Sequence, residues 1–312
     1  MRVMVSMSET VPDRGPYRDD LRGKVRGRET NEGAGMNVGI GLPATIAGVQ
    51  PEQLLEWARR AERRGFSTLG TIDRLVYGNY EPLIALAAAA AVTERIGLTT
   101  AILIAPYRAN AALVAKQAAS VNALSKGRLT LGVAVGGRED DYEASGVDFR
   151  TRGKTMDAML RTWDEVWSGD AIGPAGRPGL LIGGTADAAY RRAAEHADGW
   201  ILGGGTPDQF AEGKAKLEAA WRRAGRDGTP RTASLCYFAL GDDAQAHADG
   251  YLKDYYAFLG EYADMVAGSA ATDADTIRGY VQGFTAVGCD ELICFPCNPD
   301  PGQVDLLADA VG

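Results

Sequence analysis

Eight short apolar runs, each followed by a longer segment with helical periodicity, recur along the chain from residue 36 to its end. Near-continuous apolar strands that are each followed by a helix are typical of a parallel sheet covered by helices. Eight such units in about 275 residues fit a closed (β/α)8 barrel, the TIM barrel, better than an open sheet, which usually has fewer strands. We expect strands at 38–42, 68–72, 98–104, 129–135, 179–182, 199–202, 232–240 and 291–295. The alternative is a doubly wound sheet, but the glycine clusters lack the dinucleotide-binding pattern G-x-G-x-x-G.

The segments between the runs carry the marks of helices. Residues 51–65 begin with proline, place Leu54, Trp57 and Ala61 on one face, and end at a glycine. Further helices are expected at 81–93, 109–124, 152–167, 186–197, 207–224 and 301–310, with more than one helix in 244–287. Residues 1–35 are rich in charge, glycine and proline, so we expect a disordered extension there and a single catalytic domain over 36–312.

Charge and cysteine content narrow the class of protein. A formal net charge of −8 argues against nucleic acid or an anionic membrane as partner and favours a small molecule. No apolar run is long enough to cross a bilayer, and four cysteines without a signal-peptide pattern indicate the cytoplasm. Cys294 and Cys297 have the spacing of a redox motif, but we favour partly buried apolar cysteines. No metal site is expected, since His196 and His247 lie far from them in the sequence.

Two glycine-rich segments stand at the ends of the fifth and sixth strands. They are Gly183-Gly184-Thr185 and Gly203-Gly204-Gly205, and each precedes an expected helix. Glycine lets a backbone approach a ligand closely, and the free amide N–H groups at a helix start can hold an anion. Ordinary tight turns are the alternative, but two such segments side by side predict a phosphate site.

Charged residues follow the second, third and fourth strands, on the face where a barrel carries its function. Asp73, Arg74 and Arg108 are candidates for an active-site ion pair with a substrate anchor, or for a salt bridge on the rim. Residues 138–141 are expected on a solvated loop, with one or two functional members. Because no histidine or lysine stands directly at a strand end, a bound cofactor is the most economical carrier of the reactive centre.

Three stretches, 81–137, 141–167 and 180–201, resemble the luciferase-like flavin-dependent oxidoreductases in order and spacing. The elements T-E-R-I, A-K-Q-A-A, L-S-x-G-R and A-D-G-W occur together, and the likeness covers roughly residues 38–310. It implies a (β/α)8 barrel that binds reduced FMN or the deazaflavin coenzyme F-420. It also implies a non-prolyl cis peptide somewhere between Thr100 and Ile102.

By the same resemblance, the cofactor ring lies across the ends of strands one to four and its phosphate lies on the glycine-rich segments. The ring positions would be Leu42, Asp73, Thr100, Ala101, Ile102 and Gly136, and the phosphate positions Gly183, Gly184, Thr185, Gly203, Gly204 and Gly205. Many relatives carry Asp-His where this chain has Asp73-Arg74, so a histidine proton donor is not expected. Segment 168–179 is shorter than the insertion in many relatives, which implies a shortened lid.

Three functions remain open, and we favour a monooxygenase that uses reduced FMN and O2 on a small organic substrate, with a separate reductase as a further partner. Arg74 or Arg108 would then stabilise negative charge or anchor an anionic substrate. The alternative is an F-420-dependent reductase or dehydrogenase that transfers a hydride, with Arg138, Arg150 and Arg152 near the acidic tail of the coenzyme. The third is a flavin-binding barrel without turnover, or a phosphosugar-binding barrel enzyme. The alanine-rich helices 81–93 and 109–124 are a candidate face for a homodimer.

Overall fold

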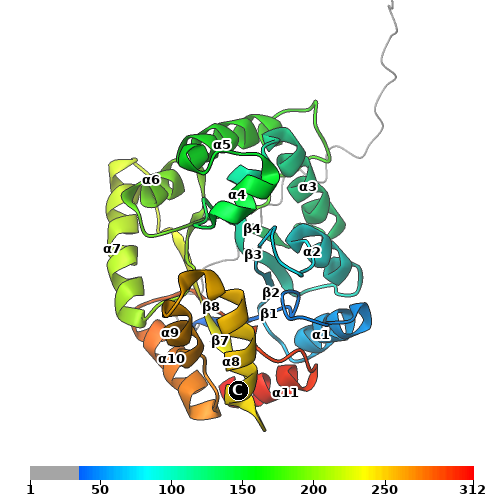
Figure 1. Cartoon of the computed structure of the whole chain (residues 1–312). Coiled ribbons are helices and arrows are strands. Elements are labelled where there is room, and N and C mark those ends of the chain that lie inside the picture. The colour runs from blue at the N-terminus through cyan, green and yellow to red at the C-terminus, as the bar shows by residue number, and fades with distance from the viewer. Residues whose placement is uncertain (1–34) are drawn as a thin grey trace, which may run out of the picture. The chain divides into compact units, whose positions relative to one another are not determined.

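The computed structural model describes residues 35–312, in which eight parallel strands close into a barrel in chain order (Figure 1). The strands are β1 (Asn37–Gly41), β2 (Thr68–Thr71), β3 (Gly97–Ile104), β4 (Leu129–Ala134), β5 (Gly179–Gly183), β6 (Gly199–Leu202), β7 (Arg231–Phe238) and β8 (Glu291–Pro296). Closure comes from β1, which pairs with β2 on one side and with β8 on the other. The expected barrel and its strands are confirmed, and the doubly wound sheet is excluded.

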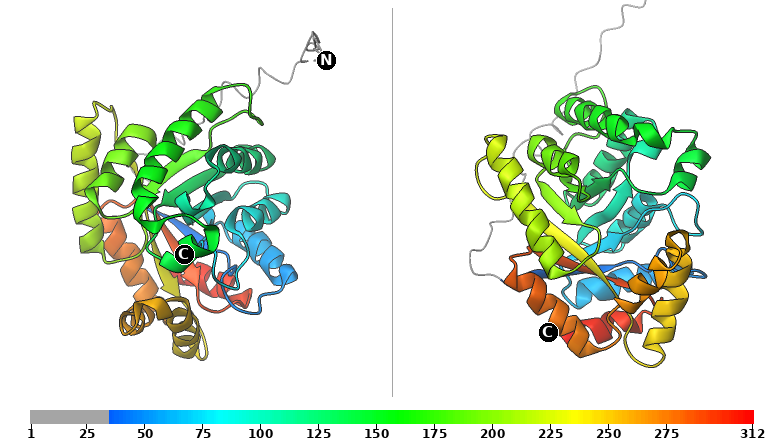
Figure 2. Two further views of the ribbon diagram at one scale, coloured as in Figure 1. Left: turned by 45° about the horizontal axis from the view of Figure 1, so that its top comes forward. Right: turned by 60° about the vertical axis from the view of Figure 1, so that its left-hand side comes forward.

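A ring of helices surrounds the strands (Figures 1 and 2). Each follows one strand: α1 (Pro51–Arg63), α2 (Pro82–Ala91), α3 (Ala111–Leu124), α5 (Arg152–Ser168), α6 (Asp187–His196), α7 (Pro207–Arg223), α10 (Ala274–Ala286) and α11 (Gly302–Val311). The face of α1 that the sequence predicts to be apolar is buried, including Leu54, Trp57 and Ala61. Burial of such faces against the strands is the main stabilising term of the fold.

Additional helices interrupt three of the connections that follow strands. After β4 comes α4 (Glu139–Ser145) with the short 3-10 helix η2 (Phe149–Thr151), and after β7 come α8 (Ala244–Tyr255), η3 (Ala257–Leu259) and α9 (Tyr262–Gly268). The 3-10 helix η1 (Pro106–Arg108) follows β3. The expectation of a loop over 138–141 is therefore wrong. Three consecutive acids in the first turn of α4 favour a helix there, because they face the positive end of its dipole.

The interior of the barrel is filled by side chains. Phe295 of β8 points into the barrel, and a Cβ atom added at Gly41 or Gly70 would lie 2.2 Å or 2.8 Å from its ring. These two glycines face each other across β1 and β2. They leave the volume that the phenyl ring occupies, so this part of the barrel holds no channel.

Segment 168–179 lies at the amino ends of the strands. Arg177 donates to Asp198, directly before β6, at 2.9 Å, and Asp198 also accepts from the backbone N–H of Leu180 at the start of β5. The segment is short, as the sequence indicates, but it cannot cover the opposite end of the barrel. The added helical segments that reach the carboxyl ends are α4, the end of α8 and η3, whose residues line the pocket there.

The four cysteines are free and buried. The Sγ atom of Cys294 lies 3.6 Å from that of Cys236 on the neighbouring strand. Burial raises the pKa of the Cys289 thiol to about 12 and that of Cys297 further still. Cys294 and Cys297 are thus free and more deeply buried than the partly buried cysteines that the sequence favours.

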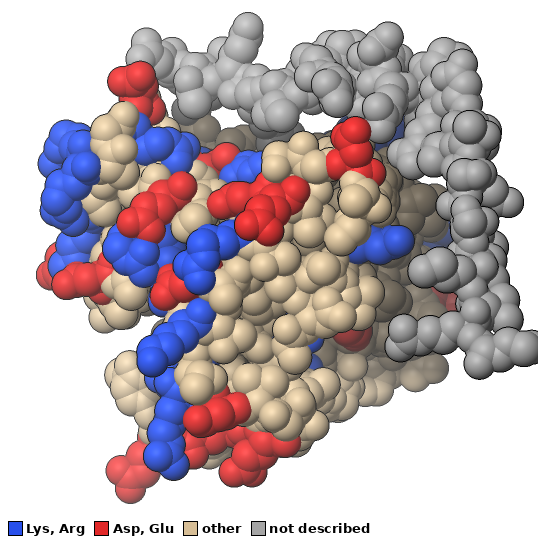
Figure 3. All heavy atoms as spheres, turned by 90° about the horizontal axis from the view of Figure 1, so that it is seen from above, with Lys and Arg blue, Asp and Glu red and all other residues tan. Residues whose placement is uncertain are grey.

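The structure bears on the expectations for the N-terminal extension, for metal sites and for membrane-spanning helices. The disordered extension, residues 1–35, lies outside it except for Gly35. Within residues 35–312 no cluster of three or more His, Cys, Asp or Glu side chains could hold a metal ion. None of the helices there is long and apolar enough to span a membrane. On the face drawn in Figure 3, positive and negative side chains interleave and leave a broad area with neither.

A substitution at Gly199 tests how closely β6 and β7 are packed. A Cβ atom at this position would lie 1.8 Å from the carbonyl oxygen of Arg231 on β7. Because that atom belongs to the paired backbone, we expect Gly199→Ala to lower the free energy of unfolding by about 3 kcal/mol. Gly250→Ala, on the exposed side of α8 with open space around it, is the control and should stabilise by about 0.5–1 kcal/mol. Urea unfolding measures both, and equal stabilities would contradict the close pairing of β6 with β7.

Candidate active site at the carboxyl ends of the strands

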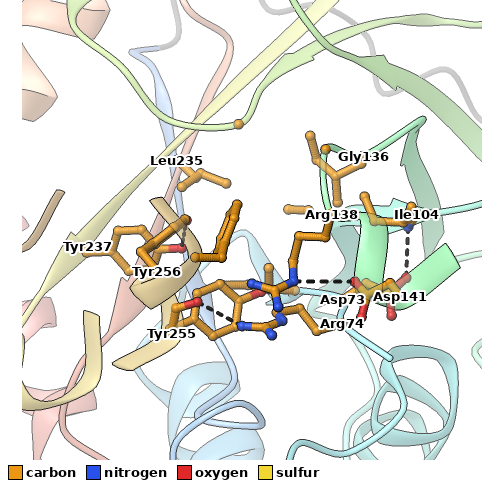
Figure 4. Close-up of a pocket in the computed structure, with 16 residues that line it drawn as sticks. Asp73, Arg74, Ile104, Gly136, Arg138, Asp141, Leu235, Tyr237, Tyr255 and Tyr256 are labelled. Atoms are coloured by element: carbon orange, nitrogen blue, oxygen red, sulfur yellow. Dashed lines mark hydrogen bonds and ion pairs between the residues drawn. The ribbon is translucent and has the colours of Figure 1, made fainter. Parts of the chain in front are cut away.

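A cavity of about 280 Å³ opens at the carboxyl ends of the strands (Figure 4). Its lining combines the ends of β2, β3 and β4 with β7 and the α8–η3 segment. The lining residues are Ile72, Asp73, Arg74, Ala101, Ile102, Ile104, Gly136, Gly137, Arg138, Asp141, Gly203, Leu235, Tyr237, Tyr255, Tyr256 and Phe258. No histidine is among them.

The lining contains six of the residues that the sequence predicts for the site. They are Asp73, Arg74, Ala101, Ile102, Gly136 and Gly203. The other predicted positions lie outside the lining: Leu42, Thr100, Arg108, Gly183, Gly184, Thr185, Gly204 and Gly205. Leu42 and Thr100 are buried, and the Thr100 hydroxyl donates to the carbonyl of Gly132 on β4 at 2.7 Å.

Asp73 and Arg108 form a buried ion pair that joins the ends of β2 and β3. The Nη1 and Nη2 atoms of Arg108 donate to the two Asp73 oxygens at 2.5 and 3.1 Å. The same carboxylate accepts from the backbone N–H of Ile104 at 2.8 Å, and Arg108 also pairs with Glu81. Although burial lowers the pKa of Arg108, the Asp73 carboxylate holds it above its usual value. The two charges thus neutralise each other, and Arg108 does not line the pocket.

Arg74 lies in the pocket itself. Its Nη1 donates to the carbonyl of Tyr255 at 2.8 Å and its Nη2 to the carbonyl of Val76 at 2.9 Å. The guanidinium carbon lies 4.6 Å from the ring centre of Tyr77 and 5.1 Å from that of Tyr255. The side chain is 6% exposed, and the nearest carboxylate, Asp140, is 3.9 Å away. Arg74 is therefore a buried cation held by carbonyls and aromatic rings.

Two charged residues at the start of α4 line the pocket: Arg138, which the sequence analysis places near the acidic tail of a bound F-420, is the N-cap residue, and Asp141 lies in the first turn. Asp141 accepts from the backbone N–H groups of Leu75 and Val76 at 3.0 and 2.7 Å, which ties the loop after β2 to α4. Arg138 pairs with Asp140 and stacks on Phe258, with 4.2 Å between its guanidinium carbon and the ring centre. The sequence analysis did not single out Asp141 within 138–141, and a predicted helix over 139–145 would have pointed to it.

An aromatic wall faces these charges. It comprises Tyr237 of β7, Tyr255 and Tyr256 at the end of α8, and Phe258 of η3. The hydroxyls of Tyr237 and Tyr256 are hydrogen-bonded to each other at 2.7 Å. Burial raises the pKa of all three tyrosines, so their hydroxyls stay neutral. The sequence analysis does not single out this wall, since the helical pattern of 244–287 does not indicate where α8 ends and which tyrosines reach the pocket.

The two glycine-rich segments differ in how their helices are capped. Thr206 and Gln209 form a capping box that occupies the first turn of α7. At α6 the N-cap residue is Ala186, whose side chain makes no cap hydrogen bond. The Trp200 indole donates to the carbonyl of Gly184 at 2.7 Å and fixes that turn. No side chain caps the start of α6, so its first amide N–H groups can meet an anion, although Asp187 also lies in its first turn.

Ile102 lies between the glycine-rich segments and the pocket. A Cβ atom would lie 2.5 Å from its Cδ1 atom at Gly183 and 3.4 Å from it at Gly203. The peptide bond between Ala101 and Ile102 is cis, within the interval that the resemblance implies. The pairing of β3 with β4 shifts register between Thr100 and Leu103.

Comparison with known proteins identifies a family that matches most of the barrel, from β1 to α10. The family described as luciferase-like monooxygenase matches residues 36–283. An uncharacterized protein of Mycobacterium tuberculosis is 33% identical over 207 residues, 54% of this chain and 71% of that protein. An F-420-dependent glucose-6-phosphate dehydrogenase of Gordonia bronchialis is 27% identical over 143 residues, 43% of this chain and 42% of that enzyme.

Among solved structures, an F-420-dependent secondary alcohol dehydrogenase in complex with an F-420–acetone adduct superposes with a TM-score of 0.77. It is 18% identical, and the match covers 89% of this chain and 98% of the other. At this identity the likeness shows the fold alone.

The Asp73–Arg108 pair generates a prediction about stability. We expect Arg108→Met to lower the free energy of unfolding by about 3 kcal/mol, because it leaves the buried Asp73 carboxylate without its cation. Asp73→Asn in the same chain should recover part of that loss, which a double-mutant cycle measures by chemical denaturation. Arg95→Met, at an exposed position, serves as the control. Additive effects of the two substitutions would contradict a direct coupling.

Proposed function

Because the chain belongs to the luciferase-like monooxygenase family, and with it to the oxidoreductases, we propose that it transfers a hydride between coenzyme F-420 and a small organic substrate. The observation that carries the choice of hydride transfer is the open mouth of the pocket. Three lining residues, Gly137, Gly203 and Phe258, are exposed. Oxygen chemistry on a reduced flavin requires a centre shielded from water, whereas hydride transfer is less demanding.

The residues at the carboxyl ends fit a cofactor with a ring and a phosphate. The phosphate would lie on Gly183, Gly184 and Thr185 at the uncapped start of α6, beside Gly203, Gly204 and Gly205. Gly184 and Gly204 have φ angles of 116° and 106°, in the region that favours glycine, so the backbone can curve around a ligand without a Cβ in the way. The ring would lie against Ala101, Ile102 and Gly136, with Leu42 and Thr100 supporting it from the core.

The cofactor, when bound, supplies the redox chemistry, and the side chains of this chain bind and orient. Asp73 and Arg108 fix the ends of β2 and β3 relative to each other, so we assign them a positioning role at the ring. Ile72, Ile102 and Leu235 shield the barrel side of the pocket from water. No step is assigned to a histidine, because none lines the pocket.

A second candidate is a monooxygenase that uses reduced FMN, delivered by a separate reductase, and O2. The apolar shielding by Ile72, Ile102 and Leu235 favours it, since it protects the inner part of the pocket. A flavin-binding barrel without turnover would use the same residues, so the three functions differ in cofactor and reaction.

The deciding experiment is an anaerobic titration of the purified protein with F-420, FMN and reduced FMN, followed by absorbance and fluorescence. The hydride-transfer proposal expects F-420 to bind at least tenfold more tightly than either form of FMN. Preferential binding of reduced FMN would favour the monooxygenase. If neither cofactor binds, both proposals are overturned.

Thr185 offers a clean test of the phosphate position. It is exposed at the uncapped start of α6, whereas a side chain at Gly183 would press on Ile102. Thr185→Asp should weaken cofactor binding at least tenfold, because it places a carboxylate against the phosphate, and Thr185→Asn is the neutral control of the same shape. Equal losses for the two variants would count against an anion at this helix start.

We also propose that the protein forms a homodimer through α2 and α3. Ile84 on α2 and Leu113 on α3 are 65% and 51% exposed, and the two helices lie side by side in Figure 1. A second copy of the same alanine-rich face would cover these side chains.

The dimer proposal is tested by Leu113→Glu. We expect a monomer in sedimentation or light-scattering measurements, because the charge would be buried at the dimer centre. Leu306→Glu, at an exposed leucine of α11, should leave the association state unchanged. A wild-type monomer, or a Leu113→Glu dimer, would contradict the proposed face.

A further inference from the structure

The positive charge of Arg74 is met by no carboxylate at hydrogen-bond distance. Its partners are the two carbonyls of Tyr255 and Val76, and its Nε atom is buried without a partner. The nearest carboxylate oxygen, on Asp140, is 3.9 Å from Nη2. The rings of Tyr77 and Tyr255 attract the cation but do not neutralise it. A buried guanidinium with so few anionic contacts is suited to an anion supplied by a ligand.

The other charges of the pocket are already matched. Asp73 is held by Arg108 and the backbone N–H of Ile104. Asp141 accepts two backbone N–H groups, and its Oδ2 atom lies 3.9 Å from Arg138. Both oxygens of the Asp140 carboxylate pair with Arg138. Asp140 therefore makes no hydrogen bond to Arg74 and lies 3.9 Å from it. Arg74 and Arg138 thus share one nearby acid, and Figure 4 shows both arginines in the pocket.

The rest of the wall is apolar or aromatic. Leu235, Tyr237, Tyr256 and Phe258 line one side, and Ile102 lines the barrel side. The Tyr237 and Tyr256 hydroxyls satisfy each other, so these rings present mainly carbon to the pocket. A ligand here gains most from one anionic group at Arg74 and a flat apolar body against the rings.

We propose that Arg74 binds a carboxylate of the substrate, and that the substrate is an organic acid with a flat apolar body. A planar carboxylate matches the donor edge of a guanidinium, which a neutral group cannot do equally well. The acid approaches the Nη edge and competes there with Asp140. This inference rests on the proposed function in that it names the substrate class for the same pocket.

The test is calorimetric titration with benzoate, benzamide and acetate, with and without saturating cofactor. We expect benzoate to bind at least tenfold more tightly than benzamide, which has the same shape without the charge, and than acetate, which lacks the ring. Equal affinity for benzamide, or no binding of benzoate, overturns the carboxylate site. Equal affinity for acetate overturns the apolar body.

Three variants locate the effect. Arg74→Gln should abolish the preference for benzoate over benzamide, whereas Arg59→Gln, at an exposed position of α1, should preserve it. Asp140→Asn should tighten benzoate binding severalfold because it removes the competing acid. An unchanged preference in a folded Arg74→Gln protein overturns the proposal. If that variant does not fold, as judged by circular dichroism, the wild-type ligand series and Asp140→Asn still decide.

The outcome can be separated from that of the proposed function. Cofactor binding has its own absorbance and fluorescence signals. Cofactor binding without a preference for benzoate would remove only the acid site. Preferential benzoate binding by a protein that binds neither F-420 nor FMN would keep the acid site and remove the proposed reaction.

Discussion

The pairing of β1 with β8 closes the sheet, and the position of every functional group follows from that closure. Residues 37–40 pair with 291–294, so the first and last strands of the domain become neighbours. All eight carboxyl ends then meet at one mouth. The closure also requires strand positions where no Cβ fits, such as Gly199 against the backbone of Arg231.

Charged side chains cross-link one half of that mouth. Asp73 and Arg108 connect the ends of β2 and β3, and Asp141 of α4 holds the loop that follows β2. The other half is formed by rings from β7, α8 and η3, which are joined mainly by aromatic contacts and by the Tyr237–Tyr256 hydrogen bond. A polar, fixed half faces an aromatic half, and Arg74 lies between them, bonded to the carbonyl of Tyr255. This arrangement gives a ligand one place for charge and one for an apolar surface.

Much of the fold could be predicted from the sequence, because strand and helix alternate with clear periodicity and glycine marks the turns. The positions of Asp73 and Arg74 in the site followed from their place after β2. Three features could not be predicted in this way. The helix α4 lies in a charged stretch without a clear apolar periodicity. The ion pair of Arg108 with Asp73 depends on side-chain rotamers on two different strands. The tyrosine wall depends on the residue at which α8 ends. All three features are determined by tertiary packing, which a local sequence pattern cannot reveal.

We propose that the carboxyl ends of the strands form a single cofactor site, with the phosphate at the start of α6. Hydrogen–deuterium exchange with and without F-420, and in parallel with reduced FMN, tests it most directly. The account predicts slower exchange at residues 102–104, 183–187 and 203–205 with the cofactor that binds, and unchanged exchange in segment 168–179 at the other end of the barrel. Protection confined to segment 168–179 or to the outer helices, with none at the start of α6, would contradict it.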